Sequence, residues 1–315
     1  MAQPTGTFDT FAQIGIREDL SDIIWNIAPT DTPFGNGIPH VEASSTNHEW
    51  QTDTLAAAAE NKAIQGDDAP QDSATATTRL GNRTMIATKD ARVSGTGRSV
   101  DTAGRADELD YQVMLRGEEL KRDWEVNLTQ NNAKVTGNAT TASEMAGLPA
   151  WLATNTSRGT GGSDPTGDGT DAATNGTQRA FTEDLLRTVL RSCWDEGGNP
   201  DVIMVGSFNK QKLSEFTGGN TFMQKSEDGT LHTAIDVYQS DFGDLRVIPN
   251  RFSPARDAFV LEMDKFALAT LPGRNMLSFD LSKTGDSDAK QILIEGTLEA
   301  RNEAASGVVA DLTTS

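Results

Sequence analysis

The chain has 315 residues, with 27 lysines and arginines against 46 aspartates and glutamates, and a formal net charge of -19 at pH 7. Because binding to nucleic-acid phosphates needs clustered basic residues, this balance argues against ordinary nucleic-acid binding. The single cysteine, Cys193, excludes an internal disulfide framework and a zinc site made of several thiolates, and its helix-like surroundings predict a small buried side chain.

Residues 1–40 are predicted to form an arm. The chain start lacks the basic and apolar regions of a secretory signal, and no apolar run is long enough to span a membrane, so we expect a soluble protein made in a cytoplasm. Apolar residues from Phe8 to Ile27 partly follow helical spacing, and Pro29 and Pro33 then impose an extended bend. Large apolar side chains without a catalytic group nearby predict a segment that grips another surface. The expected contacts are Trp25, Ile27, Pro29, Pro33 and Phe34.

Residues 41–100 are predicted to form a long extended loop. Strand-like segments at 47–54 and 82–94 flank a stretch with few large side chains, 56–78. This stretch has too little apolar surface for a core of its own, and an isolated two-stranded ribbon is marginal in water. We therefore expect the loop to lie on another surface, in this chain or in a neighbour. The contacts expected from it are Trp50 and Lys62.

The strongest periodic signal predicts a helix from Ala106 to Ala133, roughly 40 Å long. We expect Asp101 or Thr102 to cap its start and Gly137 to close its end. So long a helix suits a coiled-coil strut or a spine on which a sheet lies, and its charged faces, Glu125 included, are expected to be surface. Its apolar stripe consists of Leu109, Val113, Leu120, Trp124 and Leu128.

The remaining chain predicts a loop and then a compact subdomain. Residues 154–177 are dominated by Gly, Thr, Asp, Asn and Ser, which predicts a loop or a partly disordered excursion. Alternating helix-like and strand-like segments after residue 181 predict an α/β or α+β unit. The expected helices are 182–196, with Thr182 as N-cap, and 207–216. The expected strands are 202–205, 235–239, 245–248, 258–262, 266–271, 291–302 and 307–312.

No residue pattern predicts catalysis, a cofactor or a metal centre. His40, His48 and His232 lie in no metal-binding or catalytic motif, which favours surface or interface roles for them. The segment 164–171 resembles a calcium loop in composition but would place Asn175 where a bidentate glutamate is required. A solvated acidic loop is the favoured interpretation, and a loose calcium site stays open.

The order of these parts resembles the α+β Hong Kong 97-type fold of the major capsid, or major head, proteins of tailed bacteriophages. The segment I27-A-P-T-D-T-P-F34 is similar to the P-x-D-T-P-F turn in the arms of that family. The segment G296-T-L-E-A-R-N-E-A-A-S-G-V-V-A-D-L312 is similar to its closing strand, which has a T-L-E-x-R-N core. The resemblance implies an arm at 1–40, an extended loop at 41–100, a peripheral domain with the spine helix at 101–181 and 272–315, and an axial domain at 182–271.

The resemblance also implies a structural function. The chain would self-assemble into hexamers and pentamers of an icosahedral virion shell that encloses double-stranded DNA, with assembly in the host cytoplasm. Portal, scaffold and decoration proteins would be partners, and the acidic charge suits a container that must not hold DNA tightly. Some members of this fold link a loop lysine to a neighbour's asparagine; Lys62 is the candidate by position, and nothing identifies its partner. Others lose an N-terminal segment, which we do not expect here because the apolar arm begins at Phe8.

Two other classes of function stay open at this point. The chain could be another virion part, such as a decoration or tail protein, although the long helix followed by an α/β subdomain argues against it. It could also be a hydrolase built on residues 182–271, with His232 and Asp236 as the side chains to test, although no hydrolase motif is present. The sequence leaves open the triangulation number, the host and the face that carries the acidic excess.

Overall fold

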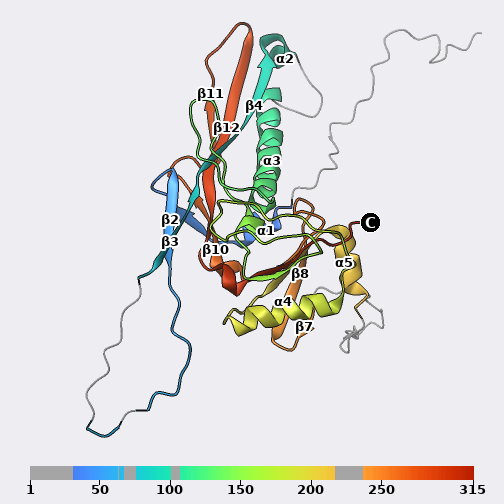
Figure 1. Cartoon of the computed structure of the whole chain (residues 1–315). Coiled ribbons are helices and arrows are strands. Elements are labelled where there is room, and N and C mark those ends of the chain that lie inside the picture. Colours follow the sequence, from blue (N-terminus) through green and yellow to red (C-terminus); the bar gives the residue numbers. More distant parts are fainter. Residues whose placement is uncertain (1–30, 63, 67–75, 101–106, 217–236) are drawn as a thin grey trace, which may run out of the picture.

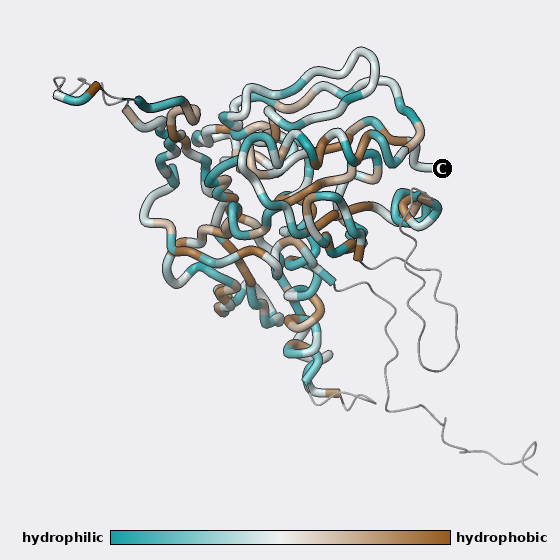
Figure 2. The backbone as a smooth tube through the Cα atoms, turned by 90° about the horizontal axis from the view of Figure 1, so that it is seen from below, coloured by the Kyte–Doolittle hydropathy of each residue, from teal (hydrophilic) through white to brown (hydrophobic). Residues whose placement is uncertain are grey.

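The computed structural model describes residues 31–62, 64–66, 76–100, 107–216 and 237–315. An elongated unit of α3, β4, β11 and β12 adjoins a more compact unit that holds α4, α5 and β8, and the extended loop projects away from both (Figure 1). Hydrophobic segments run through the interior of the body (Figure 2). Within the described ranges, no helix has the length and apolar character needed to cross a membrane.

The first sheet is built around the 14-residue strand β12 (Ser287–Ala300). One side of β12 pairs antiparallel with β10 (Phe266–Thr270) and β11 (Leu277–Asp280), and the other pairs with all of β4 (Met85–Ser94). The short strand β1 (His40–Glu42) joins β10 in parallel. The predicted closing strand at 291–302 is therefore confirmed and is longer than expected.

The spine helix α3 (Glu108–Thr129) lies along this sheet. Lys89 on β4 pairs with Asp123 on α3 at 2.8 Å. The sheet face that carries Lys89 therefore lies against the helix. The predicted apolar stripe is confirmed, since four of its members are at most 4% exposed and Val113 is partly buried. The helix is shorter than expected because Asp107 caps its start and Gln130 leaves helical geometry at its end. Gly137 therefore does not close it, and Asp101 and Thr102 lie outside the described residues.

The second sheet has six strands in the order β5-β13-β9-β6-β8-β7. Helix α4 (Glu183–Asp195) packs on it through one apolar face, and burial raises the pKa of the Cys193 thiol on that face to about 12. The predicted helices near 182–196 and 207–216 are both confirmed, the second as α5 (Ser207–Ser214). The strands are β5 (Asn155–Ser157), β6 (Val202–Val205), β7 (Val237–Ser240), β8 (Gly243–Pro249), β9 (Ala258–Leu261) and β13 (Gly307–Val309).

The two sheets do not divide where the sequence placed a boundary. The predicted division at residue 272 would leave β10 in the axial domain and β13 in the peripheral domain. Instead β10 pairs with β1 and β12, and β13 pairs with β5 and β9. Both strands are short and apolar, so only their pairing, which local sequence does not encode, decides their sheet.

The remaining elements join the sheets. Strand β2 (Asn47–Thr52) pairs with β3 (Thr78–Arg83) in a two-stranded sheet at the base of the extended loop. Only Thr84 separates β3 from β4, so the loop's return strand runs directly into the first sheet. The short helices are α1 (Pro33–Gly37), α2 (Gly95–Ser99), η1 (Leu148–Ala150), η2 (Met263–Lys265) and η3 (Glu303–Ala305).

Candidate functional site: anchors of the arm and loops

Several buried polar side chains of the described ranges hold distant chain segments together. The described ranges include no group of three or more His, Cys, Asp or Glu side chains placed to hold a metal ion. His40 is exposed, whereas His232 and Asp236 lie outside the described residues. The carboxylates of Asp168 and Asp171 accept hydrogen bonds within their own loop. The candidate functional site is therefore the set of anchors that hold the arm and loops.

A buried carboxylate fastens the end of the arm to the spine helix. Glu125 on α3 is 1% exposed and accepts hydrogen bonds from the backbone N–H groups of Phe34 and Gly35, each at 2.8 Å. The Asn250 side chain donates a third at 2.7 Å. Burial raises the pKa of Glu125, and the three hydrogen bonds oppose that rise. The carboxylate thus serves as an N-terminal cap for the short helix α1.

The local sequence explains why α1 forms at this point. Pro33 opens the helix, where a missing N–H is tolerated. A Cβ at position 35 would lie 3.0 Å from a carboxylate oxygen of Glu125, so glycine allows the close approach. Phe34 is 0% exposed, and its ring meets that of Phe266 edge-on with centroids 6.0 Å apart. The P-F-G part of the arm therefore docks on its own chain.

This docking corrects the prediction that Phe34 grips a neighbouring subunit. Its side chain is fully covered by the same chain and has no surface left for a partner. The extended bend expected at Pro33 is instead the first turn of a helix, and Pro33 is partly buried. Trp25, Ile27 and Pro29 lie outside the described residues, and their contacts stay predictions.

Asn82 holds the base of the extended loop. Its side chain is 0% exposed and donates hydrogen bonds to the carbonyl oxygens of Leu298, at 2.8 Å, and Ala146, at 3.2 Å. Its Oδ1 accepts from the Ala146 N–H at 2.9 Å. One amide therefore joins β3 to the central strand β12 and to the segment before η1.

Trp50 and Lys134 complete the same base. Trp50 on β2 is 9% exposed and packs against Trp151 with ring centroids 5.2 Å apart. The Lys134 ammonium lies 5.8 Å from the Trp151 ring and donates to the Gly81 carbonyl oxygen at 2.7 Å. Burial lowers the pKa of Lys134. The prediction of Trp50 as an intersubunit contact is corrected, because its indole packs into the core of its own chain.

The T-L-E-x-R-N segment of β12 supplies a further contact to the loop base. Glu299 accepts a hydrogen bond from His48 on β2 at 2.9 Å and another from Arg301 at 3.0 Å. The bond from His48 is the main reason that the pKa of Glu299 lies below its usual value. The motif that resembles a closing strand thus contacts the base of the extended loop through Glu299 and His48.

Replacing Asn82 with alanine is expected to lower the free energy of unfolding by about 2–3 kcal/mol, because three buried backbone groups each lose a hydrogen bond. Denaturant unfolding of the unassembled subunit measures this change. Asn47→Ala on the paired strand is the control: its side chain binds Glu49 at the surface, and we expect a change within about 0.5 kcal/mol. Equal losses in the two variants would contradict the assigned role of Asn82.

Beyond its base, the described residues of the extended loop do not pack on the body. Residues 53–62 are all exposed and belong to no helix or strand. Two large apolar side chains stand in solvent here, with Leu55 99% exposed and Ile64 77% exposed. Lys62 is also exposed and pairs with Glu60 two residues away. This part of the chain presents apolar groups that its own subunit leaves uncovered.

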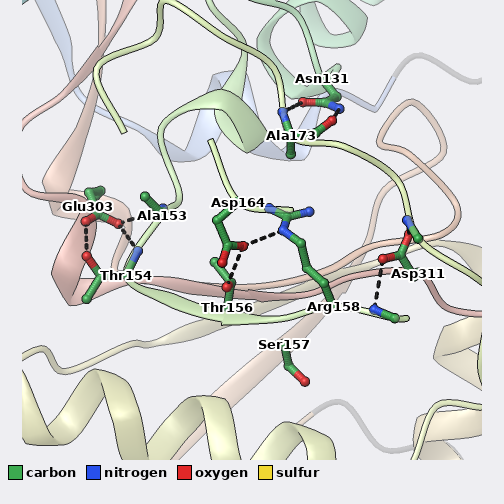
Figure 3. A network of polar contacts seen from close by, with 12 residues as sticks. Asn131, Ala153, Thr154, Thr156, Ser157, Arg158, Asp164, Ala173, Glu303 and Asp311 are labelled. Carbon is green, nitrogen blue, oxygen red and sulfur yellow. Dashed lines mark hydrogen bonds and ion pairs between the residues drawn. The ribbon is translucent and has the colours of Figure 1, made fainter. Parts of the chain in front are cut away.

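The segment 154–177 is an ordered loop and not the partly disordered excursion considered above. Glu303 accepts hydrogen bonds from the Ala153 and Thr154 N–H groups at 3.0 and 3.1 Å (Figure 3). Further along, the carboxylate of Asp164 accepts from Thr156 at 2.6 Å and from Arg158 at 2.5 Å. Glu303 thus fixes backbone positions and Asp164 holds two side chains, so both carboxylates have structural roles.

The glycine-rich parts of this loop close around Asp311, near the end of the chain. Asp311 is 0% exposed and accepts hydrogen bonds from the Gly159 N–H at 2.9 Å and the Gly176 N–H at 2.8 Å. A Cβ at position 159 would lie 2.1 Å from the Thr177 carbonyl oxygen. Arg256 pairs with the same carboxylate at 2.6 Å. Close packing, and not flexibility, therefore explains these glycines.

Sequence reasoning missed Glu125, Asn82 and Asp311. Helical spacing places Glu125 among the charges expected at the surface, although it directly follows the buried Trp124 and therefore borders the apolar stripe. Asp311 had a clearer signal, because it is the one carboxylate in the apolar run G307-V-V-A-D-L312. Asn82 gave no signal, since its partners come from segments distant in sequence.

Comparisons with known proteins agree with this architecture. A family model described as SU10 major capsid protein matches residues 3–313. A curated major capsid protein of Escherichia phage Phieco32 is 35% identical over 135 residues, which are 42% of this chain and only 38% of that protein. The alternatives of a decoration protein, a tail protein or a hydrolase find no support in these matches.

Solved structures show the fold. The structure titled "Cyanophage A-1(L) capsid asymmetric unit" matches with a TM-score of 0.62 and 14% identity, over 98% of this chain and 99% of that one. A chain from Mycobacterium phage Bobi matches with a TM-score of 0.60 and 13% identity, over 94% and 95% of the two chains. The predicted Hong Kong 97-type α+β fold is thereby confirmed. Because the family match extends over nearly the whole chain, this protein belongs to the SU10 major capsid protein family, whose members are structural components of phage capsids and not enzymes.

Proposed function

We propose that the chain forms the icosahedral head of a phage as hexamers and pentamers that enclose double-stranded DNA. The observation that carries the proposal is the extended loop, which is anchored at its base and whose described residues beyond the base are exposed. A two-stranded sheet with an exposed apolar extension is marginal in water by itself. Neighbouring copies would bury Leu55 and Ile64, and the subunit would gain stability from assembly.

The first sheet offers a surface that suits the neighbour's loop. Ile86, Leu277 and Phe279 are 54%, 39% and 37% exposed. Lys89 contacts α3, so the sheet face that carries Lys89 is the face against the helix. The strand register places all three apolar side chains on the opposite face. These three exposed apolar side chains share one face of the sheet, where a partner could cover them. We assign this face to the extended loop of a second copy, with Lys62 at the rim of the contact.

The domains and partners of the shell follow the same proposal. The first sheet with α3 would be the peripheral domain, and the second sheet with α4 and α5 the axial domain. Portal, scaffold and decoration proteins would join the shell during assembly in the host cytoplasm. Because like charges repel, a subunit with a net charge of -19 should assemble better as salt is added, and should hold DNA without tight binding.

Deleting residues 56–76 tests the proposal. Thr52 and Thr78 are paired at the end of the two-stranded sheet. After the deletion four residues connect them, Asp53, Thr54, Leu55 and Thr77, and a connection of this length can form a short hairpin turn. We expect the free energy of unfolding of the subunit to change by about 1 kcal/mol or less, because the described residues among those removed are all exposed. We expect shells to be absent in negative-stain microscopy.

A length-matched variant separates the length of the loop from its side chains. In it, residues 56–76 are replaced by a glycine and serine sequence of equal length, which removes Ile64 and Lys62 but keeps the reach of the loop. This variant should also fail to give stable shells if side-chain contacts hold neighbours together. Normal particles from the deletion would contradict the proposed function.

A further inference from the structure

A buried charge cluster joins the loop 154–177 to the end of the chain. Asp311 holds two glycine amides of the loop, as described above, and it pairs with Arg256, the residue next to Asp257. Asp257 is 6% exposed, and its Oδ1 has no hydrogen-bond partner among the described residues. Two carboxylates are thus buried side by side at the point where the loop meets the C-terminal strand β13.

Charged groups act on Asp257 from the loop, from the preceding residue and from the end of the chain. Arg158 comes from the loop and also pairs with Asp164 at 2.5 Å. Arg256 precedes β9 and pairs with Asp311 at 2.6 Å. Arg179 faces Asp311 from the segment before α4 and donates to Ser157 at 2.8 Å. Three arginines therefore balance Asp164, Asp257 and Asp311 when all three are ionised.

Burial nevertheless dominates the behaviour of Asp257. It raises the pKa of this carboxyl group to about 6, and the attraction of Arg158 and Arg256 offsets only part of that rise. The neighbouring charge of Asp311 acts in the same direction as burial. An ionised Asp257 leaves one buried oxygen without a hydrogen bond, and this is costly in a dry site. Hydration of Asp257 removes that cost but requires the loop or β13 to move away.

We propose that Asp257 is the proton-binding group of a pH-operated lock, in which its ionisation loosens the hold of Asp311 on the loop 154–177 and on β13. The lock is closed most firmly when Asp257 carries its proton. It acts within one subunit, so it does not depend on the proposed shell function.

The direction of the effect follows from proton linkage. The closed state has the raised pKa, and the open state, in which Asp257 is hydrated, has the ordinary value of 3.8. The closed state therefore binds more protons between these values, and stability from this group is lost as the pH rises through about 6. With these two values, the opening equilibrium increases about tenfold from pH 5 to pH 7.

Hydrogen–deuterium exchange of the full chain, read by mass spectrometry and corrected for intrinsic exchange rates, tests the lock. Peptides from 155–163 and 307–313 of the wild-type protein should open about tenfold more at pH 7 than at pH 5. In Asp257→Asn, which keeps the size and one acceptor oxygen, this increase should vanish. The same increase in Asp257→Asn would overturn the proposal.

A second comparison within the wild-type protein keeps the test decisive if Asp257→Asn fails to fold. The pH-dependent opening should be confined to the loop and β13, whereas peptides from the spine helix α3 should show no comparable change. An increase of equal size in α3 would show that pH acts on the whole subunit, and would also overturn the proposal. Asp311→Asn should raise opening at both pH values, because it weakens the lock itself.

Discussion

Replacing Phe34 with alanine is expected to lower the free energy of unfolding by about 3–5 kcal/mol, as is typical when a fully buried aromatic ring is removed. The ring is 0% exposed and lies where α1, the spine helix and β10 meet. Its loss leaves a cavity at the joint that holds the arm. Denaturant unfolding of the unassembled subunit, followed by tryptophan fluorescence, measures the change.

Phe279→Ala is the matched control for this prediction. Phe279 lies on the edge strand β11 and is 37% exposed, so we expect a loss below about 1 kcal/mol. Similar losses in the two variants would show that Phe34 does not pack as the structure places it. A loss confined to Phe34→Ala would show that this residue acts on subunit folding first and on assembly only as a consequence.

The sequence predicted those parts of the fold that local periodicity specifies. The spine helix was visible because Leu120, Trp124 and Leu128 recur at helical spacing and bury one face. The strands of the extended loop were visible because β-tolerant residues flank a stretch with few large side chains. The order of these parts then led to the family. None of this required knowledge of which distant segments touch.

The anchors could not be predicted because each joins segments that are far apart in sequence. Glu125 lies 91 residues from Phe34, and Asn82 lies 216 residues from Leu298. A short sequence window cannot distinguish a glutamate that caps a distant helix from one that faces solvent. The same limit explains the errors at Phe34 and Trp50, where exposed contacts were expected from apolar residues that the chain itself covers.

The order of the loop 154–177 escapes sequence-based prediction for a different reason. Glycine-rich composition is typical of flexible segments, and it is equally required where backbones and side chains crowd together. Gly159 and Gly176 belong to the second kind, because a Cβ at either position would lie 2.1 or 2.5 Å from a backbone carbonyl oxygen. Composition alone cannot separate the two cases without the position of Asp311.

Replacing Glu125 with alanine is expected to lower the free energy of unfolding by about 3–5 kcal/mol, an effect comparable to that of Phe34→Ala. Three donors lose a buried acceptor at once: the backbone N–H groups of Phe34 and Gly35 and the side chain of Asn250. Each unsatisfied buried donor costs about 1–3 kcal/mol, and the costs are only partly additive. The helix α1 should then detach from α3, and amide exchange over residues 33–38 should increase.

Glu118→Ala on the same helix is the control for the carboxylate. Glu118 is partly exposed, and alanine favours the helix, so we expect a change within about 0.5 kcal/mol and no added exchange at 33–38. If Glu125→Ala costs no more than Glu118→Ala, the packing of Phe34 alone holds the arm and the carboxylate is not an anchor. If it costs several times more, the hydrogen bonds to Glu125 fix the end of the arm on the spine helix.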